Sequence, residues 1–189
     1  MRALLITIIF VLSSASARAG DDALRRVEAY LNGLSTIVAD FTQVSPDGLL
    51  AEGRFYFERP GKMRWEYAPP TPILMVSSGS QLIYFDKELA QTTYIPMDST
   101  PAGFLMNDPI RFDENVVVEE ASDVDGVLRV TLHQAKKPEE GKLTLEFSDS
   151  PFVLRNLIVT DAANQVTSVS LNNAHFGQKL DSSLFSLRK

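Results

Sequence analysis

Three runs of the sequence place an apolar residue at every second position, and this alternation constrains the fold more than any other feature. In residues 128–132, 143–147 and 169–171, the apolar positions alternate with Arg, Thr, Glu or Ser. Successive side chains of a β-strand point to opposite faces of its sheet, so the pattern is typical of antiparallel strands with one face in water. Turn sequences such as Ser45-Pro46-Asp47-Gly48 and Asp125-Gly126 separate such short runs. We therefore predict a mainly β fold with one large meandering antiparallel sheet, curved or partly closed into a barrel.

One helix is predicted before the first strand. Asp21 and Asp22 are residue types that favour a helix start, and Gly33 is one that ends helices. Between and just beyond them, apolar residues recur at helical spacing. The members of this stripe are Leu24, Val27, Leu31 and Leu34. The stripe fits a helix packed on a core and equally a lid over a cavity, and the pattern alone does not separate the two.

A second helical segment is predicted within the series of strands. Residues 98–108 lack alternation, begin with residues that cap helices, and carry Phe104, Leu105 and Met106 in succession. Ordinary connections run over the surface and are more polar than this. We expect a short inserted helix or helical loop that packs its apolar residues onto another part of the protein.

The first 19 residues have the pattern of a cleaved secretory signal peptide. Arg2 precedes an apolar run over residues 3–12, and small residues follow up to Ala17-Arg18-Ala19, an A-x-A cleavage pattern. A membrane-spanning helix needs about 20 apolar residues, roughly twice the length of this run. We therefore predict a signal peptide at residues 1–19 and one exported, soluble domain at residues 20–189.

Charge and composition exclude several classes of function. The net charge is −6 and the isoelectric point about 4.9, whereas nucleic-acid binding requires a basic surface. The absence of cysteine excludes disulfides, a Cys-ligated zinc site and lipidation of an N-terminal Cys. His133 and His175 lack convergent partners, and no nucleophile with a neighbouring base occurs, so we expect no metal, no cofactor and no enzymatic activity. Residues 123–126 resemble a calcium loop only in part and are predicted to form a hairpin turn.

The most informative segment is an aromatic hairpin at residues 53–68. Phe55, Phe57 and Arg59 share one face of its first strand. After a Pro-Gly turn, Met63 and Trp65 alternate with charged residues on the second strand. An arginine on an apolar face is costly if it is buried without partners. Arg59 therefore either lies at the rim and extends into water, or bonds to backbone carbonyls or to a moving element over the face.

The order and spacing of motifs along the chain resemble the outer-membrane lipoprotein carrier family LolA. The matching motifs are Phe41-Thr42-Gln43, the Gly-rich approach to an Arg-Pro-Gly turn at 53–61, the aromatic strand 63–67, Pro69-Pro70, the Val-Ser-x-Gly turn at 76–79, the strand end 82–86, the lid-type sequence 100–105, residues 157–161 and Leu184-Phe185. They extend over essentially the whole chain after the predicted signal peptide.

This resemblance implies an open, unclosed antiparallel β-barrel covered by an N-terminal helix and a short inserted lid helix. It also implies a periplasmic carrier of a Gram-negative cell whose hydrophobic cavity binds the acyl chains of lipoproteins. The implied partners are acylated lipoproteins, an inner-membrane ABC-type complex that releases them and an outer-membrane receptor, with the carrier acting as a monomer. The ligand-binding residues implied are Phe55, Phe57, Arg59, Met63, Trp65, Phe104 and Leu105, with Arg59 bonded to the lid.

A lipid-binding or lipid-sensing module of the same fold is the alternative function. Sensors of this fold usually carry an additional domain, for which residues 20–189 leave no room. The chain also ends at Lys189, soon after Phe185, whereas some family members have a longer C-terminal extension.

Overall fold

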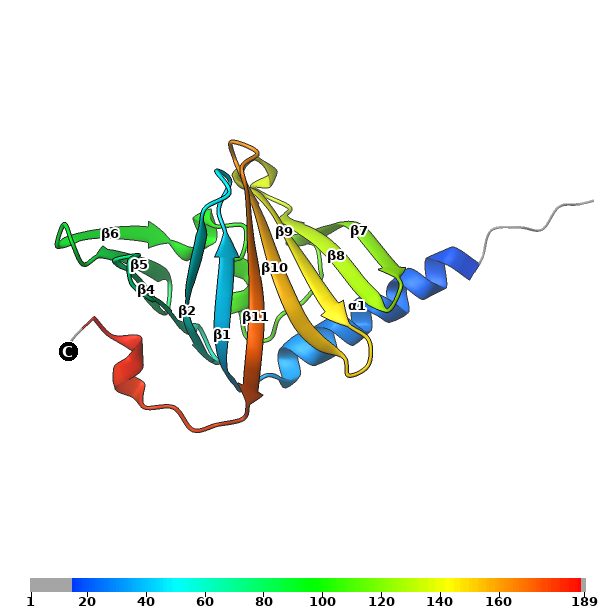
Figure 1. Ribbon diagram of the computed structural model, residues 1–189. Helices are drawn as coiled ribbons and strands as arrows, with labels where there is room; N and C mark the ends of the chain where they lie inside the picture. Colours follow the sequence, from blue (N-terminus) through cyan, green and yellow to red (C-terminus); the bar gives the residue numbers. More distant parts are fainter. Residues whose placement is uncertain (1–14, 188–189) are drawn as a thin grey trace, which may run out of the picture.

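The structure is a computed structural model that describes residues 15–187, and this part of the chain forms one α-helix, eleven strands and four short 3₁₀ helices (Figure 1). In chain order they are α1 (Ala15–Gly33), β1 (Thr36–Val44), β2 (Leu50–Glu58), β3 (Lys62–Tyr67), β4 (Ile73–Ser78), β5 (Gln81–Asp86), β6 (Gln91–Pro96), η1 (Met97–Ser99), η2 (Gly103–Met106), β7 (Val116–Val124), β8 (Val127–Gln134), η3 (Pro138–Glu140), β9 (Gly141–Ser148), β10 (Val153–Asp161), β11 (Val166–Phe176) and η4 (Ser182–Phe185).

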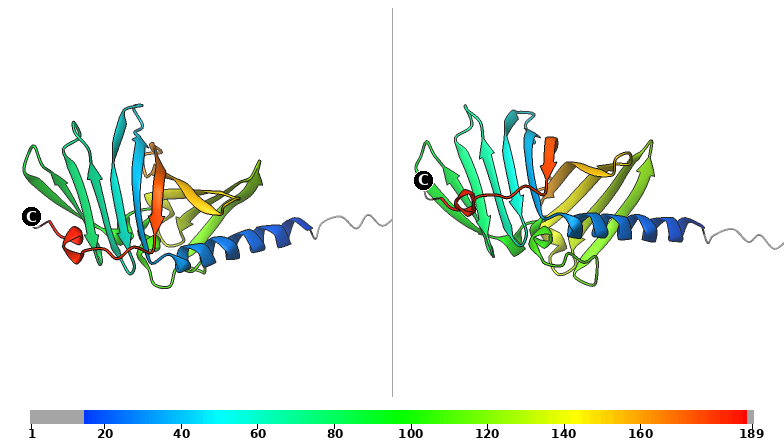
Figure 2. Two further views of the ribbon diagram at one scale, coloured as in Figure 1. Left: turned by 60° about the horizontal axis from the view of Figure 1, so that its bottom comes forward. Right: turned by 90° about the horizontal axis from the view of Figure 1, so that it is seen from below.

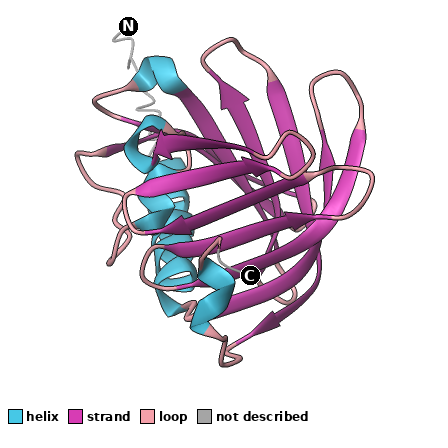
Figure 3. Ribbon diagram, turned by 90° about the vertical axis from the view of Figure 1, so that its left-hand side faces the viewer, coloured by secondary structure: helices cyan, strands magenta, loops and turns pink. Residues whose placement is uncertain are grey.

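All eleven strands belong to one antiparallel sheet in the order β6-β5-β4-β3-β2-β1-β11-β10-β9-β8-β7. β6 and β7 follow one another in the chain but lie at the two opposite edges of the sheet, so the barrel is not closed. The sheet is strongly curved, and α1 runs along its open side (Figures 2 and 3). The predicted fold class, a mainly β open barrel with covering helices, is confirmed.

The alternating runs form the concave, buried face of this sheet. Every inward side chain of residues 143–147 is fully buried at 0% exposure, and Val130 and Leu132 of β8 are buried to the same degree. The turn at Asp125-Gly126 joins β7 to β8 with positive φ angles of 54° and 77°, as a two-residue hairpin turn requires. The predicted hairpin at residues 123–126 is therefore confirmed.

α1 ends at Gly33 as predicted but begins at Ala15, before the predicted start at Asp21 and Asp22. Alanine has the highest helix propensity, and the three alanines between residues 15 and 19 favour helix on the N-terminal side of Asp21. Residues 1–14, with most of the predicted signal peptide, lie outside the described residues. No helix within residues 15–187 is long and apolar enough to cross a membrane.

The C-terminal segment forms a second, smaller core on the outer face of the sheet. From the end of β11 it turns back toward β4 and β5 (Figure 1). Phe185 of η4 is 5% exposed and packs with Leu74 and Val76 of β4. Arg64 of β3 donates to the Leu184 carbonyl at 3.0 Å. The segment is thus fixed to the sheet by apolar burial and by a charged hydrogen bond.

Candidate functional site

An apolar cavity of about 420 Å³ lies between the concave face of the sheet, α1 and the inserted segment, within the usual size range of ligand sites. Its walls come from eight strands and both covering segments. Its lining residues are Leu31, Leu34, Ile37, Gln43, Phe55, Phe57, Met63, Trp65, Tyr67, Met75, Leu82, Ala102, Leu105, Met106, Ile110, Leu143, Leu154, Leu157, Val159, Thr167, Val169 and Leu171. Apart from Gln43, Thr167, the hydroxyl of Tyr67 and the indole N–H of Trp65, these side chains are apolar.

The aromatic hairpin builds one wall of this cavity, as its alternation predicted. Across the β2–β3 pair, Phe55 is opposite Trp65 and Phe57 is opposite Met63. The rings of Phe55 and Trp65 stack with centroids 4.1 Å apart and an angle of 30° between their planes. All four side chains line the cavity. Phe55 and Phe57 are buried, whereas Met63 and Trp65 are half-buried, so the wall is apolar but not sealed by packing.

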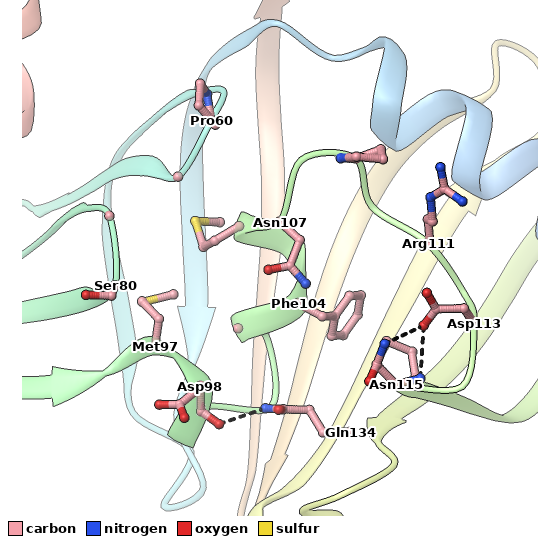
Figure 4. Close-up of a pocket in the computed structure, with 16 residues that line it drawn as sticks. Pro60, Ser80, Met97, Asp98, Phe104, Asn107, Arg111, Asp113, Asn115 and Gln134 are labelled. Carbon is pink, nitrogen blue, oxygen red and sulfur yellow. Dashed lines mark hydrogen bonds between the residues drawn. The ribbon is translucent and has the colours of Figure 1, made fainter.

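The predicted insertion at 98–108 is helical, but as the separate turns η1 and η2 instead of one helix. Leu105 lines the cavity together with Ala102 and Met106. Phe104 instead packs in the core at 5% exposure, with its ring centroid 6.4 Å from that of Phe112. It lies in the wall of a second, more polar pocket of about 580 Å³ that borders the insertion (Figure 4). Phe104 thus anchors the insertion, and Leu105 faces the cavity.

Arg59 joins the hairpin to both segments that cover the cavity. Its guanidinium donates to the Leu31 carbonyl of α1 at 3.1 Å and to the Asn107 carbonyl at 2.7 Å. It also forms an ion pair with the Asp108 carboxylate at 3.0 Å. Only 8% of its side chain is exposed, so it does not extend into water. Of the two alternatives for Arg59, the structure agrees with the second, in which Arg59 bonds to backbone carbonyls of the segments over the apolar face. Arg59 is not one of the residues that line the cavity.

Two polar residues of α1, which the sequence analysis did not identify, also hold the covering segment. The Asn32 amide donates to the Ile110 carbonyl at 2.8 Å and accepts from the Ile110 N–H at 2.9 Å. One turn earlier, the Glu28 carboxylate accepts a hydrogen bond from the Phe112 N–H. The signal for both was their spacing of four residues beside the apolar stripe, which places them on one face of the helix. Together with Arg59, they connect α1 and residues 107–112; we call residues 97–115 the lid.

The cavity has one polar end. Gln43 follows Phe41 by two positions on the inner face of β1, and its partner across the β1–β11 pair is Val169. The Tyr67 hydroxyl donates to Gln43 Oε1 at 2.7 Å, and Gln43 Nε2 donates to Ser45 Oγ at 3.2 Å. Burial raises the pKa of Tyr67 to about 12, so its hydroxyl stays protonated at neutral pH.

The two histidines lie outside this site. His133 Nδ1 is 3.0 Å from Glu119 Oε1, in a contact between β8 and β7. Within residues 15–187, no group of three or more His, Cys, Asp or Glu side chains is placed to hold a metal ion. The lining of the cavity is mostly apolar surface of a kind that can bury an apolar ligand.

Comparisons with known proteins agree with this geometry. A family model described as "Outer membrane lipoprotein carrier protein LolA" matches residues 32–188. The outer-membrane lipoprotein carrier protein of Methylococcus capsulatus is 31% identical over 174 residues, which cover 85% of this chain and 80% of the relative. That of Azotobacter vinelandii is 28% identical over 197 residues, with 98% and 92% covered. A solved structure of a DUF1329 family protein from Desulfovibrio piger is similar in fold, with a TM-score of 0.53, 11% identity, and 90% of this chain and 97% of that chain covered.

Proposed function

The chain belongs to the outer-membrane lipoprotein carrier family LolA, and from this premise we propose that its cavity holds the acyl chains of the lipoproteins it carries. The protein is a periplasmic lipoprotein carrier, and carriers of this family are not enzymes. The observation that supports the proposed site best is an apolar cavity of about 420 Å³ under a lid held by a few side chains.

The physical need for such a cavity follows from the cost of exposing acyl chains to water. Burial of one CH₂ group contributes about 0.8 kcal/mol, so a chain of roughly 16 carbons resists leaving a bilayer by on the order of 12 kcal/mol. The stacked rings of Phe55 and Trp65, with Phe57, Met63 and Leu105, provide the apolar surface that replaces the bilayer. A carrier must also release its cargo, so loading has to be opposed by something that favours the empty state.

The Arg59 bonds fulfil this second requirement. In the closed arrangement Arg59 holds the lid at Asn107 and Asp108. Entry of acyl chains displaces the lid and breaks these bonds, and their re-formation favours release. Phe104 anchors the lid by its burial in the main hydrophobic core of the protein, at 5% exposure. Arg59 and Phe104 therefore act on the lid, and the remaining predicted residues contact the ligand.

Export and exchange of cargo complete the proposal. A signal peptide at residues 1–19 is removed, which leaves the domain at residues 20–189 with Asp21 and Asp22 in the first turn of α1, where acidic residues stabilise a helix. The carrier, acting as a monomer, accepts lipoproteins from an inner-membrane ABC-type releasing complex. It delivers them to an outer-membrane receptor.

Ligand titration of the purified domain tests the proposed site. An apolar solvatochromic dye should bind at one site, and a diacylated lipopeptide should displace it. Trp65 is the sole tryptophan, so its emission reports directly on the cavity wall. Native mass spectrometry of protein taken from the periplasm should detect acylated cargo. A folded protein that binds neither dye nor lipopeptide would contradict the proposal, because it would mean that the cavity is closed by packing.

A further inference from the structure

The polar end of the cavity has hydrogen-bonding capacity that the protein does not use. A primary amide has two N–H donors, and one of the two on Gln43 goes to Ser45 Oγ. The Thr167 hydroxyl lines the same cavity and makes no hydrogen bond with any residue between 15 and 187. Two donors, one on β1 and one on β11, are thus available to a ligand.

Tyr67 fixes the orientation of one of these donors. Its hydroxyl has a single hydrogen, which it donates to Gln43 Oε1 at 2.7 Å. Since that bond occupies the carbonyl side of the amide, the Nε2 side is left for Ser45 and for the cavity. Tyr67 is 8% exposed and its ring is held edge-on to Phe41, with centroids 5.0 Å apart. Tyr67 is therefore a positioning residue for the Gln43 amide.

Because Gln43 and Thr167 lie at one end of an apolar cavity, only one part of a bound ligand can reach them. Apart from the indole N–H of Trp65, the other lining side chains are apolar, so the side-chain donors and acceptors of the cavity are concentrated at this end. The polar atoms nearest to an acyl chain in a lipoprotein are ester and amide carbonyl oxygens, which accept hydrogen bonds and carry no charge. Neutral donors such as an amide N–H and a hydroxyl match them, whereas a cationic side chain would suit a phosphate or a carboxylate.

We infer that Gln43 and Thr167 donate hydrogen bonds to the ester or amide carbonyls at the head of the acyl chains, with Tyr67 holding the Gln43 amide in place. This inference rests on the proposed function, since it assigns the head of the ligand to one end of the same cavity. It makes the cavity selective for acyl chains over plain alkyl chains, and it sets the direction in which a ligand lies.

Paired lipopeptides that differ only in the linkage test this selectivity. One has two ester-linked acyl chains on a glyceryl-cysteine peptide, and the other has two ether-linked alkyl chains of equal length. Wild-type protein should bind the ester form more tightly. Gln43→Leu, Thr167→Val and Tyr67→Phe should each lower the preference for the ester form over the ether form by about threefold to tenfold, the range for loss of one neutral hydrogen bond. Thr42→Val, next to Gln43 on the opposite face of β1, is the control and should not change this preference.

The ratio of the two affinities is measured within one variant, so a general loss of stability does not imitate the effect. A ratio that stays at the wild-type value in Gln43→Leu and Thr167→Val would overturn the inference. Equal binding of the two lipopeptides by the wild type would overturn it as well, while the carrier function would stand. Failure of the folded wild type to bind either lipopeptide would overturn the proposed function and this inference with it.

Discussion

Replacing Arg59 by leucine should convert a carrier that loads and unloads into one that loads and retains its cargo. The substitution removes the donors that hold Asn107 and Asp108 and places an apolar side chain at the border of the cavity. Both changes stabilise the open, loaded arrangement relative to the closed, empty one. Uptake of acylated cargo should therefore persist, and its release should slow.

The size of the effect follows from the bonds that break when the lid moves away from the hairpin. If α1 and the hairpin keep their positions when the lid opens, the bond from Arg59 to the Leu31 carbonyl of α1 is not broken. This bond is therefore left out of the sum. The bond from a charged group to the Asn107 carbonyl contributes roughly 1.5–3 kcal/mol. The Asp108 side chain is 57% exposed, so solvent limits the ion pair to at most about 1 kcal/mol. The total of about 2–4 kcal/mol corresponds to a factor of about 30 to 700 in the equilibrium between closed and open forms.

The assay is the transfer of a fluorescent diacylated lipopeptide from loaded carrier to liposomes, followed by stopped flow. The release rate of Arg59→Leu should fall by up to that factor, whereas the loaded fraction should equal or exceed that of the wild type. Arg59→Lys should be intermediate, because an ammonium keeps the charge but lacks the planar fork that reaches two acceptors. Circular dichroism spectra of the variants serve as the folding control. Release at the wild-type rate from a folded Arg59→Leu protein would refute the latch.

Three other predictions concern stability. Gly53→Ala should lower the melting temperature by several degrees, because an added Cβ would lie 2.2 Å from the Glu66 carbonyl oxygen and 2.6 Å from the Phe41 ring. Gly48→Ala is the comparison, because no atom lies within 4 Å of its added Cβ and only the strain of its φ of +84° would act. Phe185→Ala should cost about 3 kcal/mol in thermal unfolding and make residues 177–187 susceptible to limited proteolysis, as loss of a buried aromatic ring implies. The pKa of Tyr67 is raised from 10.0 to about 12 on folding, so the folded state holds a proton that the unfolded state loses first. The free energy of unfolding should therefore fall as the pH rises from about 10 to 12, and less steeply in Tyr67→Phe.

The sheet was predictable because its signal is local. In strands with one wet face, alternation identifies the core positions, and Leu143, Leu145 and Phe147 of β9 are buried as the pattern predicted. Glu146, which the pattern placed in water, is also buried, at 8% exposure, with bonds from Arg129 and Asn156. The same logic assigned Phe55, Phe57, Met63 and Trp65 to one face of a hairpin, and all four line the cavity. The outer core at Leu74 and Val76 was missed, although an uninterrupted apolar run over residues 73–76 is typical of a strand covered on both faces.

The lid was predictable only in part because its contacts are distant in sequence. The run of Phe104, Leu105 and Met106 indicated an apolar insertion. Three successive apolar residues in a short 3₁₀ turn do not show which of them faces the cavity, because the turn is too short for a repeating pattern. Phe104 consequently packs toward Phe112 and away from the cavity. Asn32 and Glu28 bind backbone atoms 78 and 84 residues away. Their spacing of four places them on one face of the helix, but it does not indicate which distant segment they bind.

Because the sheet is unclosed, the lid movement that we propose would not break the barrel. The lid connects β6 to β7, which lie at opposite edges and share no ladder of backbone hydrogen bonds. Opening a closed barrel would break such a ladder, at a cost for every group left unpaired. Here the cost of opening lies mainly in side-chain bonds to the lid and in its apolar contacts. Those bonds come from Arg59, Asn32, Glu28, Gln134 and Lys137. The apolar surface of the cavity can therefore be large enough to hold acyl chains. At the same time, the free-energy difference between the closed and open forms can be small enough for cargo binding to shift the equilibrium to the open form.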